Sequence, residues 1–188
     1  MIKLKDMIAR GLFTESKKLR VWDFDDTLVK TNSYIYITHG NGKKSKLSPG
    51  EYAVYTPKPA DEFDYSDFQK VTEPVELKKY TMVLRRMTRA IGSDTRVYIL
   101  TARSAYKPIK QYLKDIGISN KVYVVALASS DPKDKSDWIS DKIDSEGYDD
   151  VYFADDSEKN ISSMKQMLRR KDVKFRVQHI KEHKDYKI

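Results

Sequence analysis

The sequence predicts an α/β protein built on a parallel β-sheet. Five short apolar segments have the length and composition of buried strands, and segments of helical period alternate with the last four of them. Strands that alternate with helices favour a parallel sheet joined by right-handed crossovers. With 39% apolar residues in a chain of 188, we expect one domain over residues 1–188. The predicted strands are residues 19–22, 96–101, 121–127, 150–156 and 174–180.

The chain before and just after the first strand is less regular. Apolar residues in 2–13 have partly helical spacing, which predicts a short amphipathic helix. Residues 31–38 alternate like a strand, HGNGKK is a turn signal, and 47–56 offer a returning strand. We therefore expect a small β-hairpin flap within residues 30–73, ending in an irregular loop.

The flap region is rich in aromatic residues. We expect most of these rings to pack the hairpin onto the domain, although one or two could instead stack on a nucleic-acid base. They are Tyr34, Tyr36, Tyr52, Tyr55, Phe63, Tyr65 and Phe68.

Four helices are predicted between the later strands. Residues 74–91 have apolar side chains three and four apart, with Pro74 suited to the first turn and Gly92 to the end. Residues 104–116 form a second helix that Ser104 could cap. The other two segments are 133–146, which stops at Gly147, and 158–170.

The first strand ends in a burst of carboxylates. VWDFDDTL places Asp23, Asp25 and Asp26 directly after the apolar run, followed by Thr27. Burying ionised carboxylates side by side is costly, and like charges raise one another's pKa. A hard cation such as Mg²⁺, which prefers oxygen ligands, would remove the conflict. A solvated loop, with Asp26 and Thr27 capping a turn, is the alternative explanation.

Two later strands also end in polar groups. Thr101 closes the second strand and is followed by Ala102 and Arg103, where a hydroxyl and free backbone N–H groups could bind a phosphate. Asp155 and Asp156 close the fourth strand. Taken singly, the threonine could be an ordinary strand-end residue, and the acids could cap the next helix.

The chain resembles the haloacid dehalogenase-like (HAD) hydrolase superfamily in the order of its motifs. These are DFDDT, then a strand ending in Thr, then a strand ending in an acidic pair. The resemblance implies a Rossmann-like, HAD-type sheet of strand order 3-2-1-4-5, with the motifs at one sheet edge. It also implies no large cap, because the first cap position holds only the flap and the second, between Leu127 and Lys133, has no room. A receiver domain places its acids and Thr in a different order, and no Gly-rich P-loop is present.

The resemblance implies a phosphatase mechanism. Asp23 would attack phosphorus, forming an aspartyl-phosphate, and Asp25 would act as general acid and then base. The presence of Asp25 argues against dehalogenase chemistry. Mg²⁺ would be held by the Asp23 carboxylate, the Asp25 main-chain carbonyl and Asp156, with Asp155 assisting.

The resemblance also implies a phosphoryl-binding set. Thr101, the adjoining Ala102 and Arg103, and a lysine ahead of the fourth strand would bind the phosphate. For the lysine we prefer Lys135, which lies ahead of Trp138 and Ile139 as core anchors, with Lys133 second. Lys142 lies at the far end of the same helix. Any of these lysines could equally be a surface charge.

Charge suggests the substrate. The net charge is +8, with +4 over residues 1–20, +7 over 159–188 and −3 in between. Basic ends around an acidic middle suit a polyanion. With the small flap, this resembles the phosphatase module of polynucleotide kinase-phosphatases, so we expect a phosphorylated nucleotide or nucleic-acid end. The alternative functions are a small-molecule phosphatase, a protein phosphatase and a nucleic-acid-binding module with a vestigial site. The basic ends could also be merely a solvated surface.

Composition bounds the setting. There are no cysteines, so we expect no disulfide partner and no cysteine-based zinc site. Three scattered histidines, His39, His179 and His183, make a histidine-rich metal site unexpected. No apolar run approaches the length of a membrane span, and residues 1–13 do not resemble a signal peptide. We expect a cytoplasmic protein, and the sequence leaves its oligomeric state open.

Overall fold

A five-stranded parallel sheet organises the protein. The computed structural model describes residues 16–52 and 54–181, and the helix expected over 2–13 lies outside them. The sheet has the order β10-β9-β1-β7-β8, and every neighbouring pair is parallel. Counted along the chain this is 3-2-1-4-5, so the predicted order is confirmed. The strands are β1 (Lys18–Trp22), β7 (Thr95–Thr101), β8 (Tyr123–Ala126), β9 (Asp150–Asp155) and β10 (Lys174–His179).

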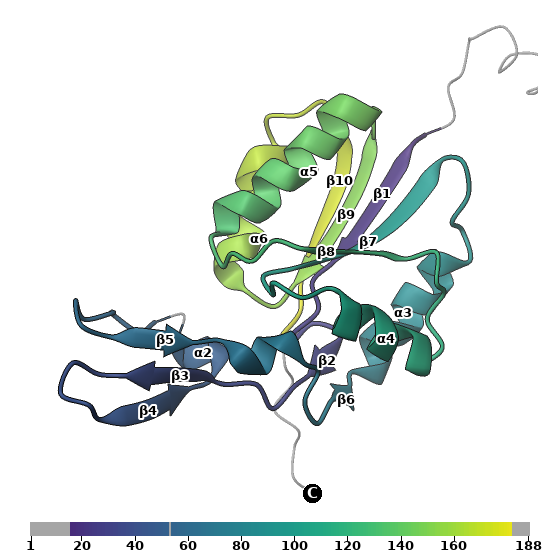
Figure 1. The fold of residues 1–188 in the computed structure, drawn as a ribbon. Coiled ribbons are helices and arrows are strands. Elements are labelled where there is room, and N and C mark those ends of the chain that lie inside the picture. The colour runs from purple at the N-terminus through teal and green to yellow at the C-terminus, as the bar shows by residue number, and fades with distance from the viewer. Residues whose placement is uncertain (1–15, 53, 182–188) are drawn as a thin grey trace, which may run out of the picture.

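Two pairs of helices, α5 (Pro132–Glu146) with α6 (Glu158–Leu168) and α3 (Lys78–Thr88) with α4 (Lys107–Asp115), accompany the sheet (Figure 1). Each pair contributes to one of two apolar clusters of the core. α5 and α6 pack together with Leu19 and Val21 of β1. α3 and α4 contribute to the other cluster, which contains Trp22. Successive side chains of a strand point to opposite faces, so β1 is buried on both sides.

Capping groups set the ends of the helices that flank β9. The Asp131 side chain accepts a hydrogen bond from the Lys133 N–H at the start of α5, and the Ser157 side chain accepts one from the Asn160 N–H at the start of α6. α5 ends at Gly147, whose φ of 70° is a left-handed conformation that glycine adopts without strain. Both helices lie where the sequence predicts them, although α6 ends at Leu168 rather than residue 170.

Residues 29–76, here called the insert, leave the sheet after β1 and return before α3. Its root is a ribbon in which β2 (Val29–Lys30) pairs antiparallel with β6 (Val75–Glu76). Beyond the root a small antiparallel sheet of order β4-β3-β5 extends away from the parallel sheet (Figure 1). Its strands are β3 (Ile35–Thr38), β4 (Lys44–Leu47) and β5 (Glu62–Asp64).

The predicted return strand of the flap, 47–56, is wrong. The strand that pairs with β3 is β4, and a short helix, α2 (Pro49–Tyr52), follows it. Ser48 and Glu51 form a capping box, in which the Ser48 N–H donates to Glu51 Oε2 at 2.7 Å and the Glu51 N–H donates to Ser48 Oγ at 3.3 Å. This motif starts a helix where a strand was expected.

Two further boundaries differ from the prediction. The expected loop after residue 56 contains β5 and a 3₁₀ helix, η1 (Ser66–Gln69), because β5 completes the insert's sheet by pairing with β3. The helix expected from residue 74 begins at Lys78, because Val75 and Glu76 pair with β2. Ser104 does not cap α4. Its hydroxyl instead accepts a hydrogen bond of 2.6 Å from Gln69 Nε2.

A polar cluster joins the strands of the insert. His39 Nδ1 lies 2.8 Å from Asp61 Oδ1, and His39 Nε2 lies 2.8 Å from Ser45 Oγ. The Tyr55 hydroxyl donates to Asp61 Oδ2 at 2.6 Å, and this bond is the main cause that lowers the pKa of Asp61 to about 2. The carboxylate therefore stays ionised and holds three parts of the insert together.

In the described ranges, no helix has the length and apolar character that crossing a bilayer requires.

The sheet core gives a first test of the fold. Phe153 on β9 has no exposed surface, whereas Phe175 on the edge strand β10 is 37% exposed. Phe153→Ala should lower the free energy of unfolding by about 3–5 kcal/mol, because it leaves a cavity between the sheet and the helices. Phe175→Ala should cost less than about 1 kcal/mol. Urea denaturation of both variants measures the difference, and equal losses would contradict the placement of β9 inside the sheet.

Candidate active site

Three strand ends meet at the carboxyl edge of the sheet. β1 pairs with β7 on one side and β9 on the other, with Trp22 opposite Ile99 and Ala154. The Asp23 N–H donates to the Ala154 carbonyl at 2.9 Å. The residues just beyond these strands therefore face one another, as expected for a parallel sheet with helical crossovers.

A tight turn carries the acids that follow β1. Leu28 and Val29 both donate their N–H groups to the Phe24 carbonyl, and the Phe24 side chain is fully buried. Asp26 adopts a φ of 55°, a left-handed conformation that Asp tolerates better than most residues. The anchored Phe24 separates Asp23, which faces β9, from Asp25, which faces the insert.

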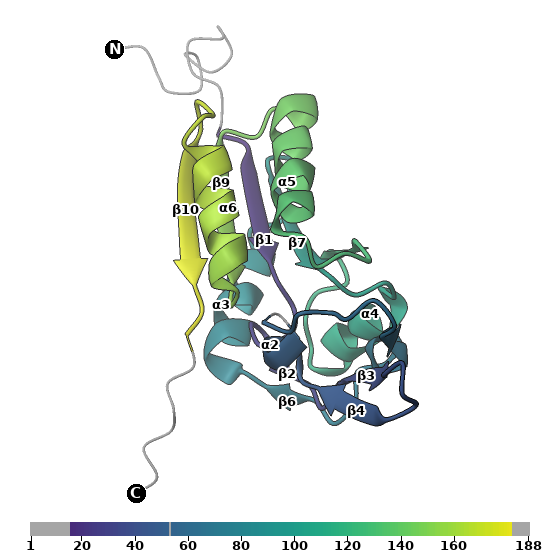
Figure 2. The same ribbon diagram turned by 90° about the vertical axis from the view of Figure 1, so that its left-hand side faces the viewer.

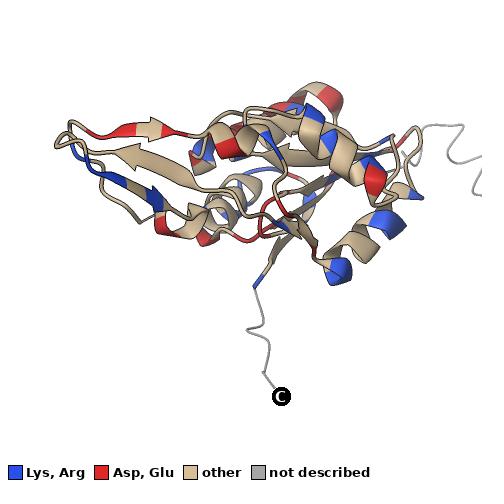
Figure 3. Ribbon diagram, turned by 60° about the horizontal axis from the view of Figure 1, so that its bottom comes forward, with Lys and Arg blue, Asp and Glu red and all other residues tan. Residues whose placement is uncertain are grey.

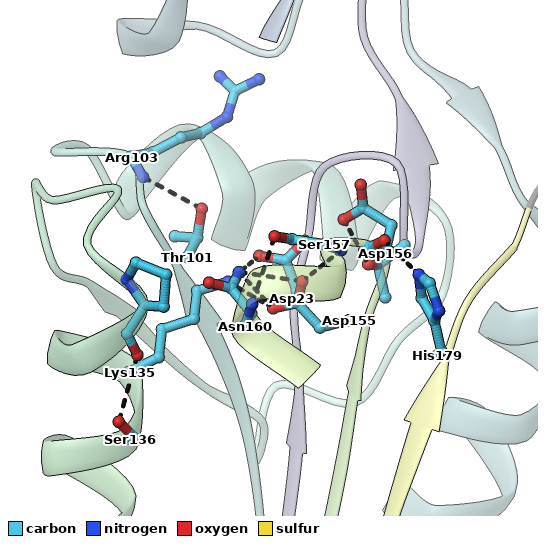
Figure 4. Close-up of polar contacts among 12 residues, drawn as sticks. Asp23, Thr101, Arg103, Lys135, Ser136, Asp155, Asp156, Ser157, Asn160 and His179 are labelled. Carbon is cyan, nitrogen blue, oxygen red and sulfur yellow. Dashed lines mark hydrogen bonds and ion pairs between the residues drawn. The ribbon is translucent and has the colours of Figure 1, made fainter. Parts of the chain in front are cut away.

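A cluster of three carboxylates lies beside a buried lysine (Figure 4). One oxygen from each of Asp23, Asp155 and Asp156 lies within 4.8 Å of the other two. Lys135 Nζ, on the first turns of α5, lies 2.6 Å from Asp23 Oδ1 and 2.8 Å from Asp155 Oδ2. Lys135 is 4% exposed, so its charge is balanced by these carboxylates and not by water.

The two acids after β9 have different partners. Asp155 is fully buried, and its oxygens accept hydrogen bonds from the Ser157 N–H at 2.8 Å and Asn160 Nδ2 at 3.0 Å, besides Lys135. The Asp156 carboxylate accepts a longer bond from Thr27 Oγ1 at 3.2 Å, while its carbonyl accepts one from His179 Nε2. Asp155 is thus a fixed structural partner of Lys135, and Asp156 has the freer carboxylate.

The cluster is electrostatically under-compensated. Burial, reinforced by the charges of Asp155, Asp156 and Asp25, raises the pKa of Asp23 well above its ordinary value even though Lys135 opposes the rise. Burial and the neighbouring Asp155 raise the pKa of Asp156 to about 7. Burial acts to lower the pKa of Lys135, but Asp23 and Asp155 outweigh it and raise that pKa. The lysine is therefore charged at neutral pH.

This donor set fits a divalent metal ion. Three carboxylates facing one ammonium leave a charge of −2 when all are ionised, and a doubly charged cation balances it. The available ligand atoms are all oxygens, which Mg²⁺ prefers. The raised pKa values of Asp23 and Asp156 have the same origin, because each carboxylate is held next to charges of its own sign.

The second strand brings its predicted residues to the same edge. Thr101, at the end of β7, is 1% exposed, and its Oγ1 accepts a bond of 3.2 Å from the Arg103 N–H. Ala102 is an exposed residue between them. The Arg103 guanidinium points away from the acidic cluster (Figure 4) and contacts Asp25 instead. Thr101 thus lies at the same edge as the cluster, whereas the Arg103 side chain belongs to a second set of contacts.

The three lysines considered for the site occupy different places. Lys135 is the one that reaches Asp23 and Asp155. Lys133 has a side chain 73% exposed that pairs with Asp137, and Lys142 pairs with Glu146 one turn later on α5. Helix α5 therefore directs Lys135 inward and the other two toward its surface.

Sequence reasoning missed two contacts at this edge. His179, at the end of β10, holds the Asp156 carbonyl, and its signal was a polar residue closing the strand next to the acidic pair. The pairing of Arg103 with Asp25 joins residues 78 positions apart, and nothing in the spacing indicates it.

Comparisons with known proteins bear on the fold. The sequence matches no protein-family model and no curated protein. The HAD domain of effector protein Lem4 from Legionella pneumophila has a similar structure, with a TM-score of 0.52 and 13% identity over 92% of this chain and 90% of that one. Effector Ceg4 of the same bacterium also has a similar structure, with a TM-score of 0.52 and 16% identity over 93% of this chain and 91% of that one. The fold is therefore HAD-like, and within it lies a buried cluster of Asp23, Asp155 and Asp156.

Metal binding by the cluster is testable without substrate. Mg²⁺ at about 100 times its Kd should stabilise the protein by about 2.7 kcal/mol, or roughly 5–10 °C in Tm. Because Asp156 has a pKa of about 7, it is protonated at pH 6 and ionised at pH 8, and a bound proton excludes the cation. The Tm gain should therefore be larger at pH 8.

Substitution variants complete this thermal-shift experiment. Asp156→Asn should abolish the Mg²⁺-dependent gain, whereas Asp141→Asn, an exposed carboxylate on α5, should keep it. A gain that is independent of pH, or that survives Asp156→Asn, would mean that the cation binds elsewhere.

Proposed function

We propose that this protein is a Mg²⁺-dependent phosphomonoester hydrolase that works through an aspartyl-phosphate on Asp23. One observation carries the proposal: a buried lysine on α5 bridges Asp23 and Asp155 beside Asp156, at the carboxyl edge of a HAD-like sheet. A nucleophilic carboxylate, a strand-end threonine, a lysine and an acidic pair, in this order along the chain, resemble the motifs of the phosphatases of that superfamily.

In the first step an Asp23 carboxylate oxygen bonds to phosphorus and the bond from phosphorus to the ester oxygen breaks. Lys135 donates to Oδ1, which leaves Oδ2 as the attacking atom. Asp25 gives the departing oxygen its proton. Water then attacks phosphorus, Asp25 takes a proton from it, and the bond between Asp23 and phosphorus breaks to release phosphate and the free carboxylate.

The remaining groups bind the phosphoryl oxygens and the cation. Lys135 and Thr101 are the donors that we assign to the phosphate. The cation would be held by the carboxylates of Asp23 and Asp156 and the Asp25 carbonyl, with Asp155 supporting through Lys135. When bound, Mg²⁺ would neutralise charge on the transferring phosphoryl group.

For the substrate we propose a phosphorylated nucleotide or nucleic-acid end, as for the polynucleotide phosphatase module that the sequence resembles. The support is the net charge of +8 together with exposed Lys43, Lys44 and Lys46 on and just before β4 of the insert (Figure 3). The basic stretch 159–188 includes Arg169 and Arg170, which follow the end of α6 (Figure 2). Asp156 lies at the other end of that helix, just before its start. The insert lysines are therefore the better candidates to meet a polyanion.

The nucleophile gives the direct test of the reaction. Asp23→Asn should lower Mg²⁺-dependent hydrolysis of 4-nitrophenyl phosphate by roughly 10³-fold or more, because the covalent step is lost. Asp26→Asn, which changes a carboxylate three residues away at a φ that Asn also tolerates, should keep activity within about tenfold. Circular dichroism checks that both variants are folded. Activity of Asp23→Asn within tenfold of wild type would remove Asp23 from the role.

Salt dependence tests the substrate class. Binding of a 5′- or 3′-phosphorylated oligonucleotide should weaken with salt, with a log–log slope near ~0.7 per phosphate contact. Replacing Lys43, Lys44 and Lys46 by Ala should raise the KM for the oligonucleotide and reduce that slope, and should leave kcat on 4-nitrophenyl phosphate unchanged.

A matched triple variant at the far end of α6, with Arg169, Arg170 and Lys171 replaced by Ala, should change neither quantity. If the KM for the oligonucleotide changes neither with salt concentration nor on replacement of the insert lysines, a small-molecule phosphate ester is the better substrate class.

A further inference from the structure

Arg103 is a buried cation outside the acidic cluster. It is 3% exposed and lies in the loop after β7. Its guanidinium forms a bidentate ion pair with Asp25, with Nε 2.8 Å from Oδ2 and Nη2 2.7 Å from Oδ1. Planar pairing of this kind fixes the orientation of a carboxylate.

The same guanidinium contacts both limbs of the insert. On the outgoing limb, Nη2 donates to Thr31 Oγ1 at 3.0 Å and to Ser33 Oγ at 3.3 Å. On the returning limb, Nη1 donates to the Phe68 carbonyl at 3.2 Å and to the Lys70 carbonyl. The guanidinium carbon also lies 5.0 Å from the Phe68 ring centroid.

These contacts occupy every donor of the side chain. Arginine has five N–H groups, and the guanidinium faces six acceptors: two oxygens of Asp25, two hydroxyls and two carbonyls. No donor is left for a substrate phosphate in this arrangement. Arg103 therefore acts on protein groups, unlike Lys135 and Thr101 in the phosphoryl site.

Asp25 is correspondingly constrained. Besides the two bonds from Arg103, Oδ1 accepts one from Thr31 Oγ1 at 3.0 Å. A carboxylate offers about four lone-pair positions, and these three bonds leave one, on Oδ2, among the contacts of the described residues. A proton can be exchanged from that position while the others hold the group in place.

We propose that Arg103 is a positioning residue that aims Asp25 for proton transfer and ties this aim to the insert. This inference rests on the proposed phosphatase function. The part of the insert just beyond its root, where Thr31, Ser33 and residues 68–70 meet Arg103, then becomes part of the catalytic apparatus rather than a cover over it. Lysine cannot replace arginine here, because one ammonium cannot bind both carboxylate oxygens in a plane and also reach two backbone carbonyls.

Leaving-group dependence tests the proposal. Phenyl phosphate releases a basic phenolate that needs a proton, whereas 4-nitrophenyl phosphate releases a weakly basic one that needs little help. Arg103→Lys should lower kcat/KM for phenyl phosphate by roughly 100-fold, within the usual contribution of general acid catalysis, and for 4-nitrophenyl phosphate by much less. A purely structural loss would lower both by one factor.

Three companion variants sharpen the test. Thr31→Val removes one bond to Asp25 without removing a charge, so it should fold and should shift the same ratio in the same direction by a smaller factor. Asp25→Asn should itself be selectively impaired on phenyl phosphate, and Arg103→Lys in that background should cause no further selective loss. Arg20→Lys alters an arginine that pairs with Asp150 at the start of β9, at the opposite end of that strand from the acidic pair, and should leave the ratio at the wild-type value.

The outcomes distinguish failure of the Arg103 role from failure of the phosphatase function. If Thr31→Val and any folded Arg103→Lys protein lose activity equally on both substrates, or if the losses of Arg103→Lys and Asp25→Asn multiply, Arg103 does not act through Asp25 and the phosphatase assignment stands. If the wild-type protein hydrolyses neither ester with Mg²⁺, the phosphatase assignment fails and the role of Arg103 fails with it.

Discussion

The main physical constraint on this structure is the burial of like charges at the carboxyl edge of its sheet. Three carboxylates and one lysine lie together where water is largely excluded, and one positive charge cannot balance three negative ones. The network reduces this cost with the amide of Asn160 and the backbone N–H of Ser157, which hold Asp155. The uncompensated negative charge is concentrated on Asp23 and Asp156, and this imbalance suits the edge to a divalent cation.

The sheet keeps the imbalance in place. β1 is central, so Asp23 is fixed between β7 and β9 by ladders on both sides, and the Asp23 N–H itself bonds to β9. Buried side chains on both faces of β1 resist any displacement of the strand end. Lys135 comes from α5, whose start is set by the Asp131 cap, so the lysine is also held by the scaffold. The proposed function requires Asp23 and Lys135 to be held rigidly in this way.

Much of this was predictable from the sequence, because strand length, helical period and motif order are local signals. The strand order and the positions of α5 and α6 follow from them, and Lys135 was preferred over Lys133 on its spacing to core anchors. The insert was predicted poorly. Its small sheet depends on pairing among β3, β4 and β5, and its helix α2 on a capping box that overlaps a strand-like run. The contact between Arg103 and Asp25 could not be predicted, because it joins distant segments through tertiary packing alone.

The narrow root of the insert has a consequence for how such a protein could diversify. The chain leaves and returns through two paired residues on each side, β2 and β6, so the ends of the intervening segment are already held together. Since the entropy of closing a loop grows slowly with its length, segments of other sizes could be exchanged there at little cost to the sheet. The exchange is free only between Ser33 and Phe68, however, because Thr31, Ser33 and the carbonyls of Phe68 and Lys70 must continue to meet Arg103. The distal sheet can therefore change in size and surface while its attachment stays the same.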